Sequence, residues 1–202
     1  GTSPVASGAP YLEKLRAMRC DRFDDLIAVN ALIRPGPLDS GMTDVYIRRK
    51  LGHEPVRYPH PDLRKTLEST YGIIVYQEQV MQAARELAGY TMAEADTLRK
   101  AMGKKVKSIM RRERAKFVAG CAAQGHGETL GRELWDAIEH FAGYGFNKSH
   151  SAAYGYVAYQ TAWLKAHHPA EYMAALLTST KRDKDRTAVY LNECRAMNVD
   201  VL

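Results

Sequence analysis

Four consecutive residues with different polar chemistry stand between a glycine-aromatic loop and a long apolar segment: Asn147, Lys148, Ser149 and His150. A helix that begins here would offer unpaired backbone N–H groups and the positive end of its dipole, and both attract anions. Lys148 would add a full charge, and His150 a ring that donates a hydrogen bond or packs against a sugar. The set predicts a pocket for a triphosphate and its sugar. The alternative is a helix cap by Ser149 or Ser151, with the lysine and histidine there by chance.

A second candidate is a strongly basic segment, residues 99–116. It holds nine lysine or arginine residues against one carboxylate, so it carries +8 while the whole chain carries +6. Like charges four residues apart on a helix, such as Lys100 and Lys104, repel by roughly a few tenths of a kcal/mol. A phosphate partner would offset that repulsion, and the alternative is a solvated basic face without a partner. We expect Gly103 to end one helix and to present the cations from a turn.

The usual catalytic and metal-binding constellations are missing from the sequence. The best carboxylate pair for metal ions is Asp183 and Asp185, but the lysines and arginines around it would compete with a metal. There is no Gly-x-x-x-x-Gly-Lys phosphate loop and no Gly-x-Ser-x-Gly elbow. We therefore predict no catalytic residue, no metal site and no cofactor in this chain, and interpret it as a binding module.

The composition is that of an ordinary globular protein, with 46% hydrophobic and 26% charged residues. No apolar run approaches the ~18 residues of a membrane span, so none is predicted. The three cysteines stand far apart, and no second cysteine or histidine lies at ligand spacing from them, which argues against a zinc site or a disulfide framework. A reducing, cytoplasmic location fits this pattern. The cysteines are Cys20, Cys121 and Cys194.

The elements that must position these residues are predicted to be helices. Apolar periodicity and breaks at glycine and proline indicate an all-α chain with at most one or two short strands. The strands would lie just before residue 75 and at residues 198–202. The expected helices cover residues 11–18, 20–33, 42–51, 62–70, 75–88, 92–102, 106–124, 130–142, 151–167, 169–178 and 186–197.

Several helix ends are predicted from cap residues. Asp21 is placed to cap the second helix, and Thr91 with Glu94 forms a capping box for the helix at 92–102. The helix after the polar quartet carries an aromatic stripe. Such a stripe is more often core than a base-stacking platform, so we place it in the core, with Tyr154, the nearest to the quartet, as the exception. The stripe comprises Tyr154, Tyr156, Tyr159 and Trp163.

Four ordered strings together resemble one family: "DDLIAVNALIRPGPLDSGM", "YGIIVYQEQVMQAA", "DTLRKAMGKK" and "FAGYGFNKSHSAAYGYVAYQTAWLKAHHPAEYMAALLTS". They are similar to the fingers region of the alpha subunit of bacterial DNA polymerase III, the C-family replicative polymerase. The resemblance implies a domain at residues 10–180, a linker or lead-in at 1–9, and a helix and the start of a following segment at 181–202.

The resemblance also implies roles for the candidate residues. Fingers receive the incoming deoxynucleotide and help to hold the templating base pair. The family's "LRKAMGKK" cations face the triphosphate, which carries over to Arg99 and Lys100, and by extension to Lys104 and Lys105. His150 is then the candidate for sensing the sugar, where a ribose 2′-OH would clash. Asn147, Lys148 and Ser149 support the nucleotide site, and the DNA-binding candidates are Lys107, Arg111, Arg112 and Arg114.

Two further motifs match the family and are interpreted as architectural, "RPGPLDSGM" and "YQEQV". The family's catalytic aspartates and its Mg²⁺ belong to the palm, outside this stretch, so the isolated chain is expected to be inactive. The implied partners are a dNTP, primer–template DNA, and the remaining polymerase domains with their sliding clamp. From the residues alone, two alternatives stay open: a stand-alone basic helical DNA-binding module, and a pure protein-interaction domain.

Overall fold

The structure is a computed structural model that describes residues 9–104, 107–142 and 144–201. These residues form helices, and the only β-type pairing among them is one isolated parallel bridge between Tyr76 and Phe146. The prediction of an all-α chain is confirmed. The chain divides into two compact units, Gly1–Ala152 and Ala153–Leu202, and the division falls inside one helix, α10 (Lys148–His167). No described helix has the length and apolar character needed to cross a bilayer.

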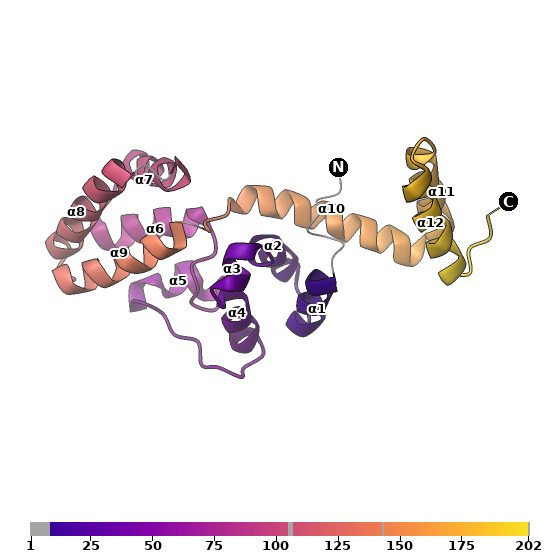
Figure 1. The fold of residues 1–202 in the computed structure, drawn as a ribbon. Helices are drawn as coiled ribbons and strands as arrows, with labels where there is room; N and C mark the ends of the chain where they lie inside the picture. The colour runs from indigo at the N-terminus through magenta and orange to yellow at the C-terminus, as the bar shows by residue number, and fades with distance from the viewer. Residues whose placement is uncertain (1–8, 105–106, 143, 202) are drawn as a thin grey trace. The chain divides into compact units, whose positions relative to one another are not determined.

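The first unit begins with four helices (Figure 1): α1 (Ala9–Met18), α2 (Phe23–Leu32), α3 (Pro35–Asp39) and α4 (Met42–Lys50). Their buried side chains form one hydrophobic cluster around Leu32 and Tyr46. The predicted cap of α2 is wrong. Asp25, three residues into the helix, accepts hydrogen bonds from the N–H groups of Asp21 (3.2 Å) and Arg22 (3.1 Å). The buried Asp25 carboxylate also pairs with Lys50 at 3.2 Å, which compensates its burial.

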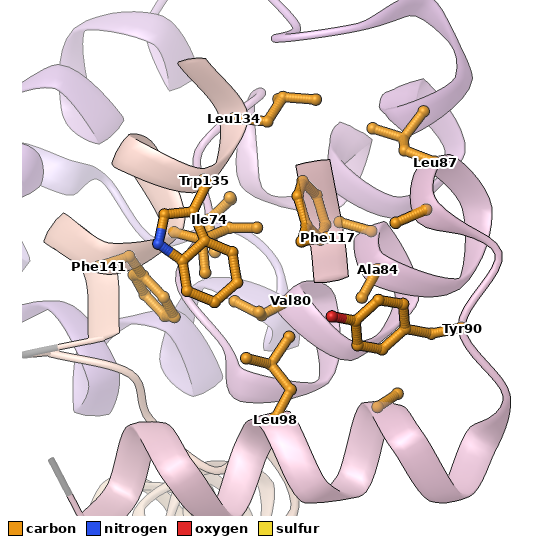
Figure 2. Close-up of a cluster of buried hydrophobic side chains, with 14 of the residues drawn as sticks. Ile74, Val80, Ala84, Leu87, Tyr90, Leu98, Phe117, Leu134, Trp135 and Phe141 are labelled. Atoms are coloured by element: carbon orange, nitrogen blue, oxygen red, sulfur yellow. The ribbon is translucent and has the colours of Figure 1, made fainter. Parts of the chain in front are cut away.

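The rest of the first unit packs around a second cluster (Figure 2). Its elements are the short turns η2 (Pro61–Leu63), α5 (Arg64–Leu67) and η3 (Glu68–Thr70), followed by α6 (Gln77–Ala88), α7 (Met92–Lys104), α8 (Lys107–Ala123) and α9 (Glu128–Ala142). Leu98 of α7, Phe117 of α8 and Trp135 of α9 are fully buried here. Gly120 lets α8 approach the end of α6, because a side chain there would overlap with the carbonyl of Ala88.

Several predicted boundaries change in the structure. The single helix expected at residues 62–70 is a broken run of 3₁₀ and α turns. The strand expected before residue 75 is reduced to the Tyr76–Phe146 bridge, and residues 199–201 form no strand. The Thr91–Glu94 capping box is confirmed: the Thr91 N–H donates to the Glu94 carboxylate (2.8 Å), and the Glu94 N–H donates to the Thr91 hydroxyl (3.3 Å).

The second unit contains the rest of α10, then α11 (Pro169–Thr180) and α12 (Lys184–Ala196). Met173 of α11 and Cys194 of α12 are its buried side chains among the residues that the structure describes. Asp183, the weak metal candidate of the sequence, is the N-cap of α12, since its carboxylate accepts the Arg186 N–H at 3.1 Å. It also pairs with the Arg186 guanidinium at 3.3 Å.

The prediction that the aromatic stripe of α10 lies in the core is wrong. Tyr156, Tyr159 and Trp163 are 57%, 51% and 44% exposed, and Tyr154, the expected exception, is 49% exposed like the others. The physical reason is the small size of the second unit. A core formed around one methionine and one cysteine cannot bury four large rings.

Candidate nucleotide-binding site

The polar quartet forms the first turn of α10, but its cap differs from the predicted one. The helix begins at Lys148, and the Asn147 side chain accepts the backbone N–H of His150 at 2.8 Å. Ser151 is buried instead of capping, and its hydroxyl donates to the carbonyl of Ile27 in α2. The serines were expected to cap because serine is a strong N-cap residue. Asparagine is equally strong, and it stands one residue ahead of the observed helix.

A carboxylate from α6 is hydrogen-bonded to the N-terminal end of α10. Glu78 accepts hydrogen bonds from the backbone N–H of Lys148 at 3.0 Å and from the side-chain amide of Asn147 at 3.1 Å. The backbone N–H groups of Lys148 and His150, which the sequence analysis assigned to a triphosphate, therefore already donate to acceptors within the protein. Any contact with a ligand would therefore be made by side chains: Lys148 is partly exposed, and Ser149 and His150 are exposed.

Lys148 and His150 both rest on aromatic rings. The Lys148 ammonium lies 5.4 Å from the centre of the Tyr76 ring, within the range of a cation–π contact. The His150 ring lies 5.6 Å from the ring of Phe146. Arg34 covers the same Phe146 ring at 4.5 Å. These contacts give the two polar side chains a fixed base, while His150 stays exposed to solvent.

The two motifs interpreted as architectural hold the loop that leads into α10. From "YQEQV", the Gln77 N–H donates to the Phe146 carbonyl (2.9 Å) and the Gln77 side chain donates to the Gly145 carbonyl (3.3 Å). From "RPGPLDSGM", Arg34 donates to the carbonyl of Tyr144. Burial lowers the pKa of this guanidinium. Gly36 packs so closely on the ring of Tyr144 that a methyl group there would overlap with it.

Gln79 fixes the start of α6, on which Gln77 and Glu78 lie. It is nearly fully buried, and its side-chain oxygen accepts the N–H groups of Val75 (2.8 Å) and Tyr76 (3.0 Å). Its amide donates to the hydroxyl of Thr70 at 2.7 Å. With these polar atoms paired, the burial carries little penalty. Within the "YQEQV" motif, Gln79 thus anchors the helix, while Gln77 and Glu78 hold the loop.

Arg99 and Lys100 lie on the surface of α7, next to the buried Leu98. Both pair with Asp96, whose carboxylate is 2.8 Å from the Arg99 guanidinium and 2.8 Å from the Lys100 ammonium. Hydrogen bonds from Lys100 and then Arg99 lower the pKa of Asp96. The Arg99 side chain is one third exposed and that of Lys100 nearly two thirds. The two cations therefore form one surface cluster around the Asp96 carboxylate.

The helix end predicted at Gly103 is displaced by one residue, because α7 includes Gly103 and ends at Lys104. Gly103 has helical backbone and is exposed. Lys105 lies outside the described residues, as do the side chains of Lys104 and Lys107. The structure thus leaves these three nucleotide- and DNA-binding candidates as predictions.

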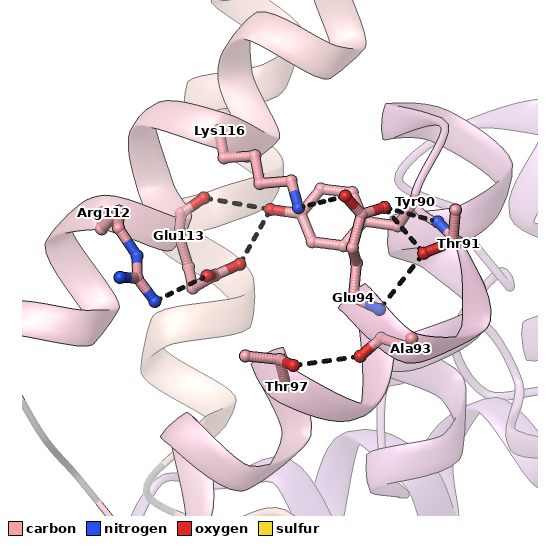
Figure 3. A network of polar contacts seen from close by, with 8 residues as sticks. All are labelled: Tyr90, Thr91, Ala93, Glu94, Thr97, Arg112, Glu113 and Lys116. Atoms are coloured by element: carbon pink, nitrogen blue, oxygen red, sulfur yellow. Dashed lines mark hydrogen bonds and ion pairs between the residues drawn. The ribbon is translucent and has the colours of Figure 1, made fainter.

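The cations of α8 are better paired than the sequence suggested (Figure 3). Lys116 lies 2.7 Å from Glu94 of α7 and 4.5 Å from the centre of the Tyr90 ring. Arg114 lies 2.9 Å from Asp136 of α9. Carboxylates on neighbouring helices thus offset part of the repulsion within the basic segment, which no local pattern reveals. Arg111 and Arg112 are exposed on α8, and Arg112 also lies 3.9 Å from the carboxylate of Glu113.

The α7 segment that carries Arg99 and Lys100 and the loop before α10 both pack on the same hydrophobic cluster. Leu98 beside Arg99 and Phe141 at the end of α9 belong to the same buried cluster, and the Phe141 ring packs on Gly145 of the loop before α10. Arg99 and Lys100 bind Asp96, whereas Lys148 meets Glu78 and Tyr76. The convergence of these two sets of cations on one anion stays a prediction.

Comparison with known proteins assigns the family. The bacterial DNA polymerase III alpha subunit finger domain matches residues 10–125. The chain belongs to this family. It is 51% identical to the DNA polymerase III subunit alpha of Pseudomonas aeruginosa over 94% of its length, and 55% identical to that of Aquifex aeolicus over 85%. These matches span 17% and 15% of the two relatives.

The polar quartet at the start of α10 lies beyond the residues that match the finger-domain family. It lies within the similarity to the Campylobacter jejuni DNA polymerase III subunit alpha, which is 47% identical over the whole chain and 17% of that relative. The chain therefore spans about one sixth of the length of the curated relatives it matches. The resemblance stated from the four sequence strings is confirmed.

Proposed function

We propose that this chain acts as the fingers of a template-directed DNA polymerase and positions the incoming dNTP and the templating base pair. Membership of the finger-domain family carries the proposal. The geometry supports it at one place: Lys148 and His150 are presented on a helix start that is clamped to α6 through Glu78. A cytoplasmic location, and primer–template DNA, the other polymerase domains and the sliding clamp as partners, are part of the same proposal.

Different side chains would contact different parts of the nucleotide. Arg99 and Lys100 would meet the triphosphate and release Asp96 as they do so. Lys148 would add a third charge, and His150 would lie against the sugar with Asn147 and Ser149 holding the turn. Such fixed charges accelerate phosphoryl transfer by orienting the nucleotide and stabilising negative charge. Because Glu78 and Asn147 already use the helix-end amides, we assign the charge stabilisation to side chains and not to the α10 dipole.

The catalytic metal ions are not assigned to this chain. The polymerase family implies Mg²⁺ held by carboxylates, and the best carboxylate pair here does not fit that role. Asp183 caps α12 and pairs with Arg186, and the neighbouring lysines add further positive charge. We propose that the palm of the intact enzyme supplies both the carboxylates and the Mg²⁺.

The decisive experiment removes Arg99. In the intact polymerase that carries this chain, Arg99→Ala should lower kcat/KM for dNTP incorporation about a hundredfold, equivalent to about 2–3 kcal/mol for one lost charge-assisted contact. Arg132→Ala is the matched control, since Arg132 is also an exposed helical arginine paired with a carboxylate, Glu128. Activity of Arg99→Ala within twofold of the control would remove Arg99 from the nucleotide site.

A second candidate function is DNA binding through α8 alone, and the exposure of Arg111 and Arg112 favours it. It predicts measurable affinity of the isolated chain for DNA, with a steep dependence on salt and none on dNTP. Lys107 and Arg114 would belong to the same surface, although Arg114 is already paired with Asp136. A titration across salt concentration, with and without dNTP, separates the two functions. A protein-interaction domain would show neither kind of binding.

A further inference from the structure

Two loops that are distant in the sequence bring together the ligand set of a metal site. His60 and Asp62 lie at the start of η2, and His126 lies in the turn between α8 and α9, sixty-six positions after His60. One nitrogen of each histidine and one carboxylate oxygen all lie within 4.8 Å of one another. No short ligand spacing in the sequence reveals these three residues as a set, because the cluster exists only in the fold.

The backbone holds each of the three residues in place. His60 is the N-cap of η2, and its Nδ1 accepts the backbone N–H of Asp62 at 3.3 Å. His126 stands between Gly125 and Gly127, which have φ of +86° and +83°. That backbone conformation suits glycine, and the His126 N–H donates to the carbonyl of Cys121 at 2.9 Å. The ligand positions therefore rest on ordered turns at both ends.

The side chains also face one another at suitable distances. The two imidazole rings are 4.7 Å apart between centroids and meet edge to face at 78°. The Asp62 carboxylate lies 3.5 Å from Nδ1 of His60. Ligands around a tetrahedral ion at 2.0–2.1 Å are separated by roughly 3.4 Å. The Nδ1–carboxylate pair already has about this spacing, and an ion bound at Nδ1 would replace the hydrogen bond from the Asp62 N–H. All three ligand atoms lie within 4.8 Å of one another.

The chemistry of the donors selects the kind of ion. Two imidazoles and one carboxylate suit Zn²⁺, Co²⁺ and similar ions, whereas Mg²⁺ and Ca²⁺ prefer oxygen ligands. A site with three protein ligands leaves one position for water. Asp62 is exposed and both histidines are partly exposed, so the ion and its water have access from solvent.

We propose that His60, Asp62 and His126 bind one divalent transition-metal ion, with Zn²⁺ as the best fit. The ion would tie the start of η2 to the α8–α9 turn and so fasten the two ends of the segment that contains α5, α6, α7 and α8. Its role is structural, because the candidate nucleotide residues lie on other elements, α7 and the start of α10. The site is independent of polymerase activity, and its test does not use that activity.

The test compares metal binding by the 202-residue chain and three variants after removal of metal with a chelator. Zn²⁺ affinity is measured by competition with a chromophoric chelator, and Co²⁺ is used to record the absorption of a tetrahedral site. The wild type and the control His53→Ala, an exposed histidine in the preceding loop, should bind one equivalent. His126→Ala and Asp62→Asn should bind Zn²⁺ at least tenfold more weakly and lose the Co²⁺ bands.

Thermal unfolding provides the second measurement. Zn²⁺ should raise the Tm of the wild type and of His53→Ala, since a ligand that binds the folded state stabilises it, and should leave the Tm of His126→Ala unchanged. Far-UV circular dichroism checks that each variant is folded, and His126→Gln replaces His126→Ala if the alanine variant is not. Failure of the wild type to take up one equivalent, or equal uptake by His126→Ala, would overturn the proposal. In that case the two histidines serve only as packed rings.

Discussion

The carboxylate of Glu78 lies 3.0 Å from the backbone nitrogen of Lys148, and this contact joins the starts of two helices that are seventy residues apart. It places a negative charge where the sequence suggested an open anion site. The same carboxylate holds the side chain of Asn147, which caps α10. Glu78 of α6 thus contributes to the orientation of the polar quartet.

Replacing Glu78 by alanine should therefore destabilise the first unit. The variant loses the acceptor for two donors at the start of α10, and the loss of a helix cap costs about 1 kcal/mol. Urea denaturation followed by circular dichroism measures the change in unfolding free energy. Glu139→Ala, an exposed glutamate of α9, should change the unfolding free energy by less than about 0.5 kcal/mol. Equal stability of the two variants would show that the Glu78 contact contributes nothing.

Gly36 offers a test of how closely the "RPGPLDSGM" motif packs on Tyr144 in the loop before α10. A Cβ at position 36 would overlap with the ring of Tyr144, so Gly36→Ala must displace that ring at a cost of about 1–3 kcal/mol. Gly103 is the matched control, because it is also helical and has open space around its Cβ position. Gly103→Ala should raise the unfolding free energy by up to about 1 kcal/mol. Opposite signs for the two variants in denaturant unfolding are the expected result.

The Glu94 carboxylate gives the first unit a defined acid sensitivity. Hydrogen bonds from Lys116 and then from Thr91 lower the pKa of Glu94 from about 4.5 to about 2. A carboxylate with a lowered pKa stabilises the folded state fully above its unfolded pKa, and that contribution is lost as the pH falls through the folded value. The wild type should therefore be more stable than Glu94→Gln above about pH 5. This advantage should shrink from about pH 4.5 towards pH 2, and also at high salt because the pair is exposed.

Unfolding curves of both proteins between pH 2 and pH 7 measure this difference. Glu139→Gln is the control, and its difference from the wild type should show no such trend. A Glu94→Gln curve that runs parallel to the wild-type curve over the whole range would mean that the Glu94–Lys116 contact in Figure 3 does not hold in solution.

Local rules were enough to predict features whose causes lie within a few residues. The Thr91–Glu94 box needs only a three-residue spacing, and it forms as expected. Pro169 begins α11 because proline suits the first helical turn. The helices themselves follow from apolar periodicity, so the all-α class was accessible from sequence. The family strings identified the family, which periodicity alone does not supply, and the roles that they imply for single residues stay predictions.

Features that depend on contacts across the fold were missed for a physical reason. The choice of Asn147 as a cap, and the occupation of the Lys148 amide, depend on Glu78, which is seventy positions away. The pairing of Lys116 with Glu94 depends on how α7 and α8 pack. The exposure of Trp163 depends on how many buried side chains surround α10. The spacing of the aromatic residues in the sequence carries no information about that.

His150 provides the sharpest test of the nucleotide site, because its proposed role is selection and not binding. In the intact polymerase, His150→Ala should leave kcat/KM for dNTP within about threefold. It should raise kcat/KM for the matching rNTP, so that sugar discrimination falls at least about tenfold through loss of a steric contact. His53→Ala, which removes an exposed histidine in the loop after α4, should keep the discrimination of the wild type. The ring of His150 lies 5.6 Å from that of Phe146 and the residue is exposed, so its removal leaves no core cavity. Discrimination unchanged in His150→Ala would exclude the imidazole from the sugar site, whereas equal loss for both nucleotides would make it a positioning residue for the turn.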